Sequence, residues 1–264
     1  MNALDLVSIP PGEIELRDAR SRGKRLVALE PFSLGSIPVM ASQWASVKGG
    51  AKGQDVPGKR DGSAPKHPVT WFDAIRWCNK ASEAAGLTPA YSVHHRDIVW
   101  YPEADGYRLP TEAEWEWACR AGTTTPRYGE LADIAWTAAD EVEGPQEVAG
   151  KAPNGFGLFD MLGNVWEWCW DYADTARYGD YRSLRGGGWA DPAWSCRASV
   201  RRGSAPDAVL EDVGFRVARG AVGTTGEQQA QGWSAVEDWQ RAQIRGPLPL
   251  GWTPNRELRR PGAP

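Results

Sequence analysis

Hydrophobic and polar residues alternate along the first third of the chain. The segments LVSIPPGEIELRD and KRLVALEPFSLG, within residues 6–35, follow a period of two around a Pro-Pro-Gly turn, as half-buried antiparallel strands do. A further strand pair is predicted for residues 91–101. The polar, glycine-rich stretch of residues 48–66 has no hydrophobic period and is expected to form a loop.

Two other stretches have helical spacing. In the first, Thr70 precedes and Gly86 follows apolar residues placed at i, i+3, i+4 and i+7, so a helix is predicted between them. The apolar residues of this stripe are Ala74, Trp77, Cys78 and Ala81. In the second, Thr111 and Glu114 form an S/T-x-x-E capping box, which indicates the start of a helix.

The second helix is expected to be deeply buried, because its apolar residues surround it. They are Ala113, Trp115, Trp117, Ala118 and Ala121. Two buried helices among short, irregular antiparallel strands predict an α+β fold with little regular secondary structure.

Composition narrows the class of protein. Of the 264 residues, 24% are charged and the formal net charge is −4, which provides no basic surface for nucleic acid. No apolar run reaches the length of a membrane span. The N-terminus lacks the pattern of a signal peptide, so a cytoplasmic location is expected. The four cysteines have no CxxC spacing, which argues against a zinc site or a disulfide framework.

Three segments share one order of features: a glycine turn, a tryptophan-rich run and a charged anchor. They are GYRLPTEAEWEWACRAG (residues 106–122), PNGFGLFDMLGNVWEWCWD (residues 153–171), and residues 184–219, from LRGGGW to GFRVAR. In this order they resemble the formylglycine-generating-enzyme and sulfatase-modifying-factor family, whose fold is a variant of the C-type-lectin fold. The resemblance implies one such domain over residues 1–219, followed by a C-terminal segment over residues 220–264.

Most of the residues that carry the resemblance are expected to stabilise the fold. Buried indole rings dominate core energetics, so the core is expected to contain Trp115, Trp117, Trp166, Trp168 and Trp189. Buried arginines fix loop geometry when they pair with carboxylates. We expect Arg108, Arg185 and Arg216 to pair with Glu112, Glu116, Glu167 or Asp171.

The resemblance also implies a structural calcium ion at the GNVWE segment. Asp160 and Glu167 would supply carboxylate oxygens, and Gly163 and Val165 would supply backbone carbonyls. Hard oxygen ligands from a tight loop suit calcium. The second calcium site of the family is expected to be absent, because residues 132–153 look shortened.

The chemistry of the family depends on two cysteines separated by four residues, which bind copper and activate oxygen. Soft thiolates select Cu(I), so both are needed. Alignment from the GFR motif places Ala193 and Ala198 at these two positions, and Cys196 lies between them. A lone cysteine on an apolar segment is more often a small core residue than a nucleophile. The resemblance therefore argues against copper and against oxidation of sulfatase cysteines.

Other branches of the family give further alternatives. The sulfoxide synthases carry a three-histidine iron site on a helical domain, whereas this chain has His67, His94 and His95 and no helical bundle to hold them, so this branch is excluded. The siderophore-maturation and nitrite-reductase-accessory relatives have less defined chemistry, and that alternative stays open.

Binding relatives use the same fold to display side chains between the RGG and GFR motifs, as in diversity-generating retroelement proteins; others act as immunity proteins. The comparable loops here are residues 189–194 and 202–212, where aromatic rings lie beside small, adaptable residues. The candidate binding residues are Trp189, Asp191, Trp194, Arg202, Ser204, Asp207 and Glu211. A protein or peptide partner is expected, and neither nucleic acid nor a membrane.

The C-terminal segment is the part least like the family. Residues 221–232 are expected to form a flexible linker, and Ser234 with Glu237 predicts a capped, short amphipathic helix. A proline-rich extended stretch follows. Its tryptophans and aliphatic residues favour an arm packed across its own domain, the alternative being a contact with a partner or a second copy.

Two functional hypotheses follow. The first is a catalytically silent recognition or scaffold domain that binds through residues 189–194 and 202–212. The second is an oxygen- and metal-dependent oxidase that modifies a peptide or small molecule with Cys196, possibly together with Cys169.

Overall fold

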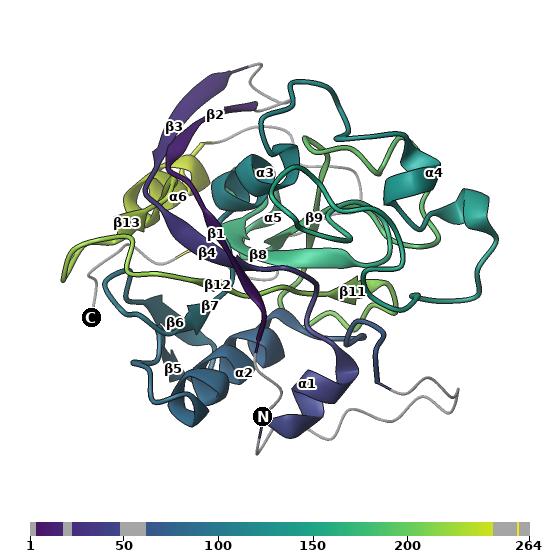
Figure 1. Ribbon diagram of the computed structural model, residues 1–264. Helices are drawn as coiled ribbons and strands as arrows, with labels where there is room; N and C mark the ends of the chain where they lie inside the picture. The colour runs from purple at the N-terminus through teal and green to yellow at the C-terminus, as the bar shows by residue number, and fades with distance from the viewer. Residues whose placement is uncertain (1–3, 18–22, 48–61, 245–257, 259–264) are drawn as a thin grey trace.

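The first sheet joins the two ends of the domain predicted for residues 1–219. In the computed structural model, which describes residues 4–17, 23–47, 62–244 and 258, its strand order is β1-β4-β12-β7 (Figure 1). Their bounds are β1 Leu6–Ile9, β4 Phe32–Gly35, β12 Ala218–Arg219 and β7 Tyr107–Arg108. Leu34 pairs with Val7 on one side and with Ala218 on the other. Distant parts of the sequence therefore close this sheet.

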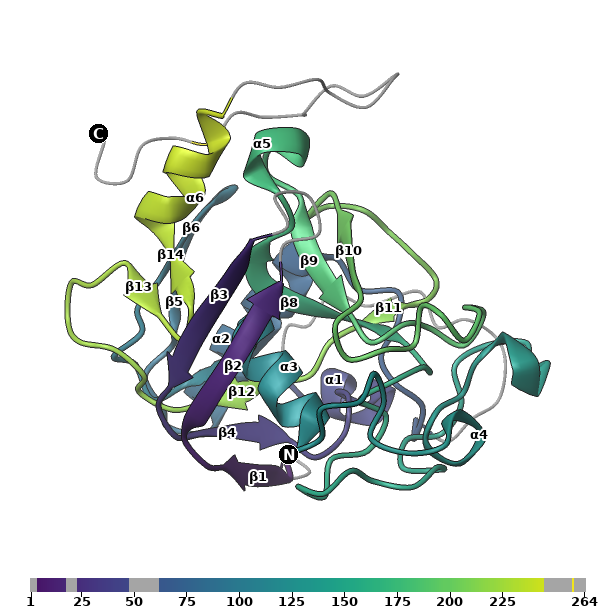
Figure 2. The same ribbon diagram turned by 90° about the horizontal axis from the view of Figure 1, so that it is seen from above.

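The predicted Pro-Pro-Gly turn leads from β1 into a separate hairpin. Its strands, β2 (Gly12–Arg17) and β3 (Lys24–Leu29), are antiparallel and pack against helix α3 (Glu112–Arg120) (Figure 2). The indole N–H of Trp117 donates to the carbonyl of Pro10 at 3.0 Å. A Cβ on Gly12 would lie 2.3 Å from the Trp117 ring, so the close approach of hairpin and helix requires glycine there.

The two predicted helices form with their predicted caps. Helix α2 (Trp71–Ala84) begins after Thr70, whose hydroxyl accepts the Asp73 N–H, and Gly86 follows its end with φ +70°. In α3, Thr111 and Glu114 make the reciprocal capping box. The burial of α3 is confirmed except at Trp117 and Ala121, which are half-buried. A third, short helix, α1 (Ala41–Ser46), carries Trp44 into the core.

The second sheet has the strand order β10-β9-β8-β11. Its bounds are β10 Arg201–Ser204, β9 Arg182–Arg185, β8 Trp166–Tyr172 and β11 Val213–Gly214. The predicted pair at residues 91–101 forms the hairpin of β5 (Tyr91–His94) and β6 (Asp97–Trp100). The remaining helical turns are α4 Leu131–Ile134, η1 Ala138–Asp140 and α5 Thr175–Tyr178. These short elements confirm the α+β class with little regular structure.

Tryptophan rings fill the space between the two sheets and the helices. The Trp170 ring lies 5.4 Å from that of Trp71 and 5.6 Å from that of Trp100. Such pairs add about 0.5–1.5 kcal/mol each beyond burial of area. The expected core positions Trp115, Trp166 and Trp168 are buried, whereas Trp117 and Trp189 are half-buried. None of the helices in the described ranges is long and apolar enough to cross a membrane.

The segment expected as a flexible linker is partly ordered against the domain, so that expectation is wrong for its second half. Strands β13 (Gln229–Ala230) and β14 (Trp233–Ser234) form a hairpin, and α6 (Ala235–Ala242) follows with Ser234 as its N-cap. The buried Gln231 side chain exchanges two hydrogen bonds with the backbone of Glu30 and donates to Glu114. The buried Gln231 side chain therefore orders a segment whose composition is typical of flexible linkers. Residues 245–257 and 259–264 of the expected arm lie outside the described residues.

Replacing Gln231 with Ala is expected to destabilise the protein by about 1–3 kcal/mol, because it removes a hydrogen-bond donor from the buried Glu114 carboxylate and the acceptor of the Glu30 N–H. Urea unfolding measures this loss, and limited proteolysis within residues 223–228 should accelerate in the same variant. Gln240→Ala, at an exposed position of α6, is the matched control. Equal stability of the two variants would contradict this role of Gln231.

Candidate functional site

Three arginines of the first and third segments form buried ion pairs. Arg216 meets Glu167 through two hydrogen bonds of 2.7 Å, from Nε and Nη2. Arg185 pairs with Glu116 at 2.5 Å and lies 3.6 Å from Glu112. These two pairings were expected. The third arginine, Arg108, pairs with Glu114 of its own capping box, a partner that the sequence pattern did not single out.

The GNVWE segment forms a tight turn next to Arg216. Asp160 and Asn164 have φ of +53° and +59°, and a Cβ on Gly163 would lie 2.2 Å from the carbonyl of Trp136. One Asp160 oxygen accepts the Ala149 N–H at 2.7 Å and the other lies 3.4 Å from the amide nitrogen of Asn164.

The two carboxylates among the implied calcium ligands, Asp160 and Glu167, are therefore already engaged by hydrogen-bond donors. Both oxygens of Glu167 are held by Arg216, and one also accepts the indole N–H of Trp115 at 2.7 Å. Calcium takes six to eight oxygen ligands, and it would have to compete with these donors. Calcium binding by Asp160, Gly163, Val165 and Glu167 stays a prediction. A melting temperature that rises with calcium after EDTA treatment would support it, and an unchanged one would count against it.

Cys196 lies in a setting unsuited to redox chemistry. Its side chain is fully buried, and burial raises the pKa of its thiol to about 12. A Cβ on Gly187 would lie 2.6 Å from its sulfur, so the thiol packs against the backbone of the RGG motif. Cys169, within β8, is also fully buried, and burial raises its pKa well above the ordinary value. Because the thiolate is the metal ligand and nucleophile, both cysteines have the properties of core residues.

The two predicted binding loops meet at Trp166. Its indole N–H donates to the Asp191 carboxylate at 2.6 Å, and the same oxygen accepts the Gly188 N–H at 2.8 Å. From the other loop, the guanidinium of Arg202 lies 5.7 Å from the Trp166 ring centroid and pairs with Asp212 at 3.2 Å. Residues 189–194 and 202–212 therefore form one surface that is fixed at its base.

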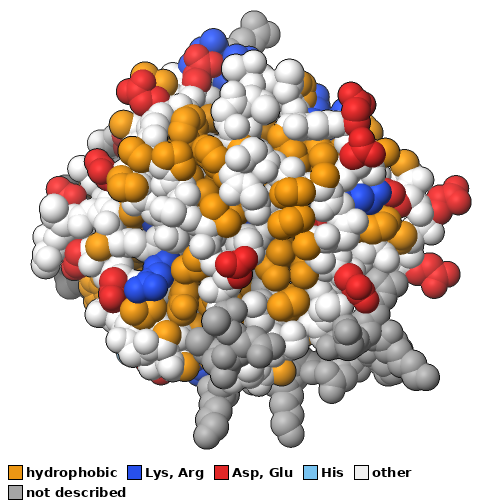
Figure 3. All heavy atoms as spheres, in the orientation of Figure 1, with side chains coloured by type: hydrophobic (Ala, Val, Ile, Leu, Met, Phe, Trp, Pro, Cys, Tyr) orange, Lys and Arg blue, Asp and Glu red, His pale blue; other side chains and the backbone are white. Residues whose placement is uncertain are grey.

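The tips of these loops expose apolar side chains. Trp194 is 64% exposed and Val209 is 71% exposed, while Trp189 is half-buried. The backbone around Trp194 is held by Arg197 Nε, which donates to the carbonyl of Trp194 at 2.6 Å. Hydrophobic side chains are scattered over the face of the molecule shown in Figure 3. An exposed apolar side chain therefore does not by itself identify a binding site in this molecule. An exposed apolar side chain on a loop whose backbone is held in place is a more specific indication.

The other predicted binding residues make their contacts away from Trp166. Asp207 is exposed and pairs with Arg96 at 2.8 Å. Glu211 is exposed, and its carbonyl is 2.8 Å from Nδ1 of His67. Ser204 ends strand β10 and pairs in register with Arg182. The structure thus places Asp191 and Arg202 at Trp166 and these three residues away from it.

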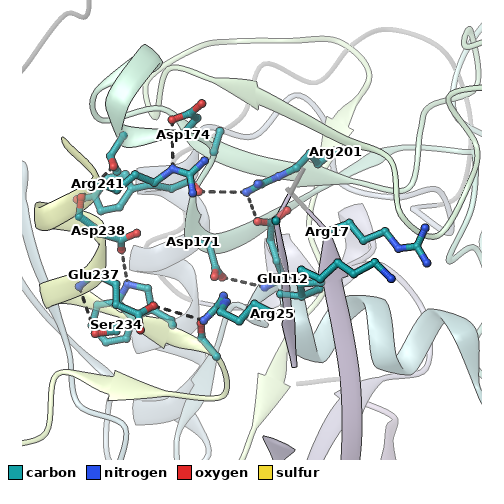
Figure 4. A pocket seen from close by; sticks show the side chains of 18 residues that line it. Arg17, Arg25, Glu112, Asp171, Asp174, Arg201, Ser234, Glu237, Asp238 and Arg241 are labelled. Atoms are coloured by element: carbon teal, nitrogen blue, oxygen red, sulfur yellow. Dashed lines mark hydrogen bonds and ion pairs between the residues drawn. The ribbon is translucent and has the colours of Figure 1, made fainter. Parts of the chain in front are cut away.

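A polar pocket that the sequence did not predict lies between the β2–β3 hairpin and α6. Its volume is about 300 Å³, and it opens beside Glu112 of α3 and Asp171 of β8 (Figure 4). The hairpin contributes Arg17, Lys24 and Arg25, and the C-terminal segment contributes Trp233, Ser234, Glu237, Asp238 and Arg241. Its two halves are far apart in the sequence. The one signal available was the acidic Asp171 near the end of a buried, tryptophan-rich strand.

Comparison with known proteins agrees with this geometry. The Sulfatase-modifying factor enzyme 1-like domain matches residues 2–221. "Chaperone protein LppX" of Paenibacillus barcinonensis is 28% identical over 81% of this chain and 89% of its own length. The formylglycine-generating enzyme of Streptomyces coelicolor is 29% identical over 83% and 90%, respectively.

Two further comparisons concern activity and fold. The protein of Bos taurus described as "Inactive C-alpha-formylglycine-generating enzyme 2" is 33% identical over 60% of this chain and 61% of its own length. The structure of Treponema denticola variable protein 1 superposes with a TM-score of 0.70, with 30% identity over 81% of this chain and 94% of that one. The structure of CarF gives a TM-score of 0.67, with 27% identity over 82% of this chain and 98% of that one.

The fold and the buried arginine–carboxylate pairs define a C-type-lectin-like domain of the formylglycine-generating type. The third segment, residues 184–219, contains one cysteine, Cys196, and it is buried. The chain belongs to the sulfatase-modifying factor enzyme 1-like family.

Proposed function

We propose that this chain is a catalytically silent recognition domain that binds a protein or peptide partner through residues 189–194 and 202–212. The observation that carries the proposal is the junction at Trp166. Asp191 and Arg202 hold the bases of the two loops there, and Trp194 and Val209 are left open to solvent at the tips. Loops held in place before binding lose less entropy on binding, and exposed tryptophan is enriched among interface residues that dominate affinity.

The buried cysteines favour a catalytically silent domain over the oxidase hypothesis. Oxidation with Cys196 requires a reachable thiolate, whereas its thiol is buried and its pKa is about 12. A family relative is described as inactive, and another relative is named a chaperone protein. Both descriptions are in line with a role in which another protein is bound and no cysteine is oxidised.

Site-specific photo-crosslinking in the native cells tests the binding surface. With p-benzoylphenylalanine in place of Trp194, we expect an adduct of one defined mass, which a Val209→Asp substitution in the same chain reduces at least about tenfold. The matched control places the same group at Tyr101, an exposed aromatic position beyond β6. The same adducts at both positions, or none at residue 194, would overturn the proposal.

The oxidase alternative is tested on purified protein by copper content and by oxygen consumption with a cysteine-containing sulfatase peptide. We expect neither stoichiometric copper nor peptide-dependent oxygen uptake, and no change in Cys196→Ser. Copper bound at one equivalent and lost in Cys196→Ser would instead establish the oxidase hypothesis.

A further inference from the structure

The charged side chains around the pocket between the β2–β3 hairpin and α6 are mostly paired with one another. Arg201 contacts Glu112. The other pairs are Arg241 with Asp174 at 3.3 Å, Arg25 with Glu237 at 3.5 Å, and Arg17 and Lys24 with Glu15 at 3.1 Å each. Each cation of the pocket therefore already has a carboxylate partner.

Two carboxylates at the pocket have no such cation. Asp171 is 8% exposed, and one of its oxygens accepts the Glu112 N–H at 2.8 Å. Its other oxygen has no hydrogen-bond partner among the described residues. Asp238 accepts the indole N–H of Trp233 at 2.9 Å, and neither Asp171 nor Asp238 has a basic side chain within 4.0 Å in the described ranges. Figure 4 shows both carboxylates among the residues that line the pocket.

Burial disfavours the ionised form of both groups, and the charges of Arg25 and Arg182 offset this only in part. Burial raises the pKa of Asp171 to about 7, with Glu112 and Asp238 adding to the effect, and the pKa of Asp238 to about 6. A ligand with positively charged N–H groups would supply the missing charge and the missing hydrogen-bond donors together.

The size and the arrangement of the pocket indicate what kind of cation fits. A volume of about 300 Å³ is at the lower end of small-molecule sites. No group of three or more His, Cys, Asp or Glu side chains in the described part of the chain is arranged to hold a metal ion. The Trp233 ring also lines the pocket, and aromatic rings attract organic cations.

We propose that this pocket binds a small organic cation, an ammonium or guanidinium compound, whose N–H groups donate to Asp171 and Asp238. The site is separate from the surface of residues 189–194 and 202–212. One of its walls is α6, which follows the part of the chain that matches the family. The pocket is thus a binding site that the C-terminal segment completes.

Isothermal titration of the full chain with agmatine, which has one ammonium and one guanidinium group, tests the proposal. At pH 8 we expect binding of one equivalent with a Kd below about 1 mM. The comparison ligand is 4-guanidinobutanoate, in which a carboxylate replaces the ammonium, and it should bind at least about tenfold more weakly. A heat of titration with agmatine no larger than that with buffer would overturn the proposal. Displacement of agmatine by calcium chloride or magnesium chloride at a concentration below that of agmatine would also overturn it.

Matched variants locate the site. Asp171→Asn keeps the shape of the side chain and its acceptor for the Glu112 N–H, so it should fold and bind agmatine at least about tenfold more weakly. Asp238→Asn should weaken binding in the same direction, and it keeps an acceptor for Trp233. Asp133→Asn, at an exposed position in α4, is the control and should leave the Kd unchanged. Equal affinities in all three variants would overturn the assignment even if agmatine bound.

Discussion

Replacing Arg216 with Met is expected to cost about 3–5 kcal/mol of unfolding free energy, because it leaves a buried carboxylate without its cation. Arg216 is fully buried, and besides Glu167 it donates to the carbonyls of Gly35 and Phe159 at 2.9 and 3.0 Å. It therefore connects β4, the turn before β8 and β8 itself. Urea unfolding followed by tryptophan fluorescence measures the loss.

Two further variants distinguish the effect of the uncompensated charge on stability from the effect of lost packing. Arg76→Met removes a partly exposed arginine that lies 3.4 Å from Asp73 and should cost less than about 1 kcal/mol. The double variant Arg216→Met with Glu167→Gln should be no less stable than Arg216→Met alone, since the neutral amide can be buried at lower cost. An Arg216→Met variant that loses less than about 1 kcal/mol would show that the pair contributes little.

Asp171→Asn is expected to stabilise the protein at alkaline pH and to have little effect below about pH 4. The folded pKa of Asp171, about 7, lies above that of an aspartate in an unfolded chain, about 3.9. The folded state therefore holds this proton more tightly, and its contribution to stability is full at low pH. That contribution is lost as the pH rises from about 4 through 7.

The size of the effect follows from the shift in pKa. At pH 8 Asp171→Asn should be more stable than the native chain by on the order of 2–4 kcal/mol. The groups that face Asp171 are Glu112 of α3, Asp238 of α6 and Arg25 of β3, and they are the same in both proteins. Melting temperatures measured at pH 5 and pH 8, with Asp133→Asn as the control, check this. A difference that does not grow with pH would contradict a buried, protonated Asp171.

The sequence predicted those parts of the fold that local chemistry determines. Thr70 and Thr111 cap helices because their hydroxyls reach backbone N–H groups within one turn. Arg185 and Arg216 were identified as buried because they flank glycines in a tryptophan-rich frame. The partner of Arg108 was missed, because Glu114 was assigned to the capping box alone and in fact serves both roles.

The two candidate sites could be predicted to different extents, because only one of them is marked by local sequence motifs. Loops 189–194 and 202–212 are bounded by recognisable motifs, so their residues could be named, although their meeting at Trp166 is a tertiary contact. The pocket beside Asp171 required knowledge of how α6 packs. That packing depends on contacts such as the Thr175 hydroxyl with the carbonyl of Asp238 at 2.8 Å, and no local pattern in residues 221–242 reveals it.

The place of β12 in the first sheet has a consequence for synthesis of the chain. Strand β12 lies between β4 and β7, although β4 is made near the start of translation and β12 near the end of the domain. Until residue 218 leaves the ribosome, one edge of β4 therefore lacks its native partner. Unpaired strand edges invite association with other chains, and pairings between distant segments form slowly. The nascent chain is thus open to association through the edge of β4 until β12 emerges.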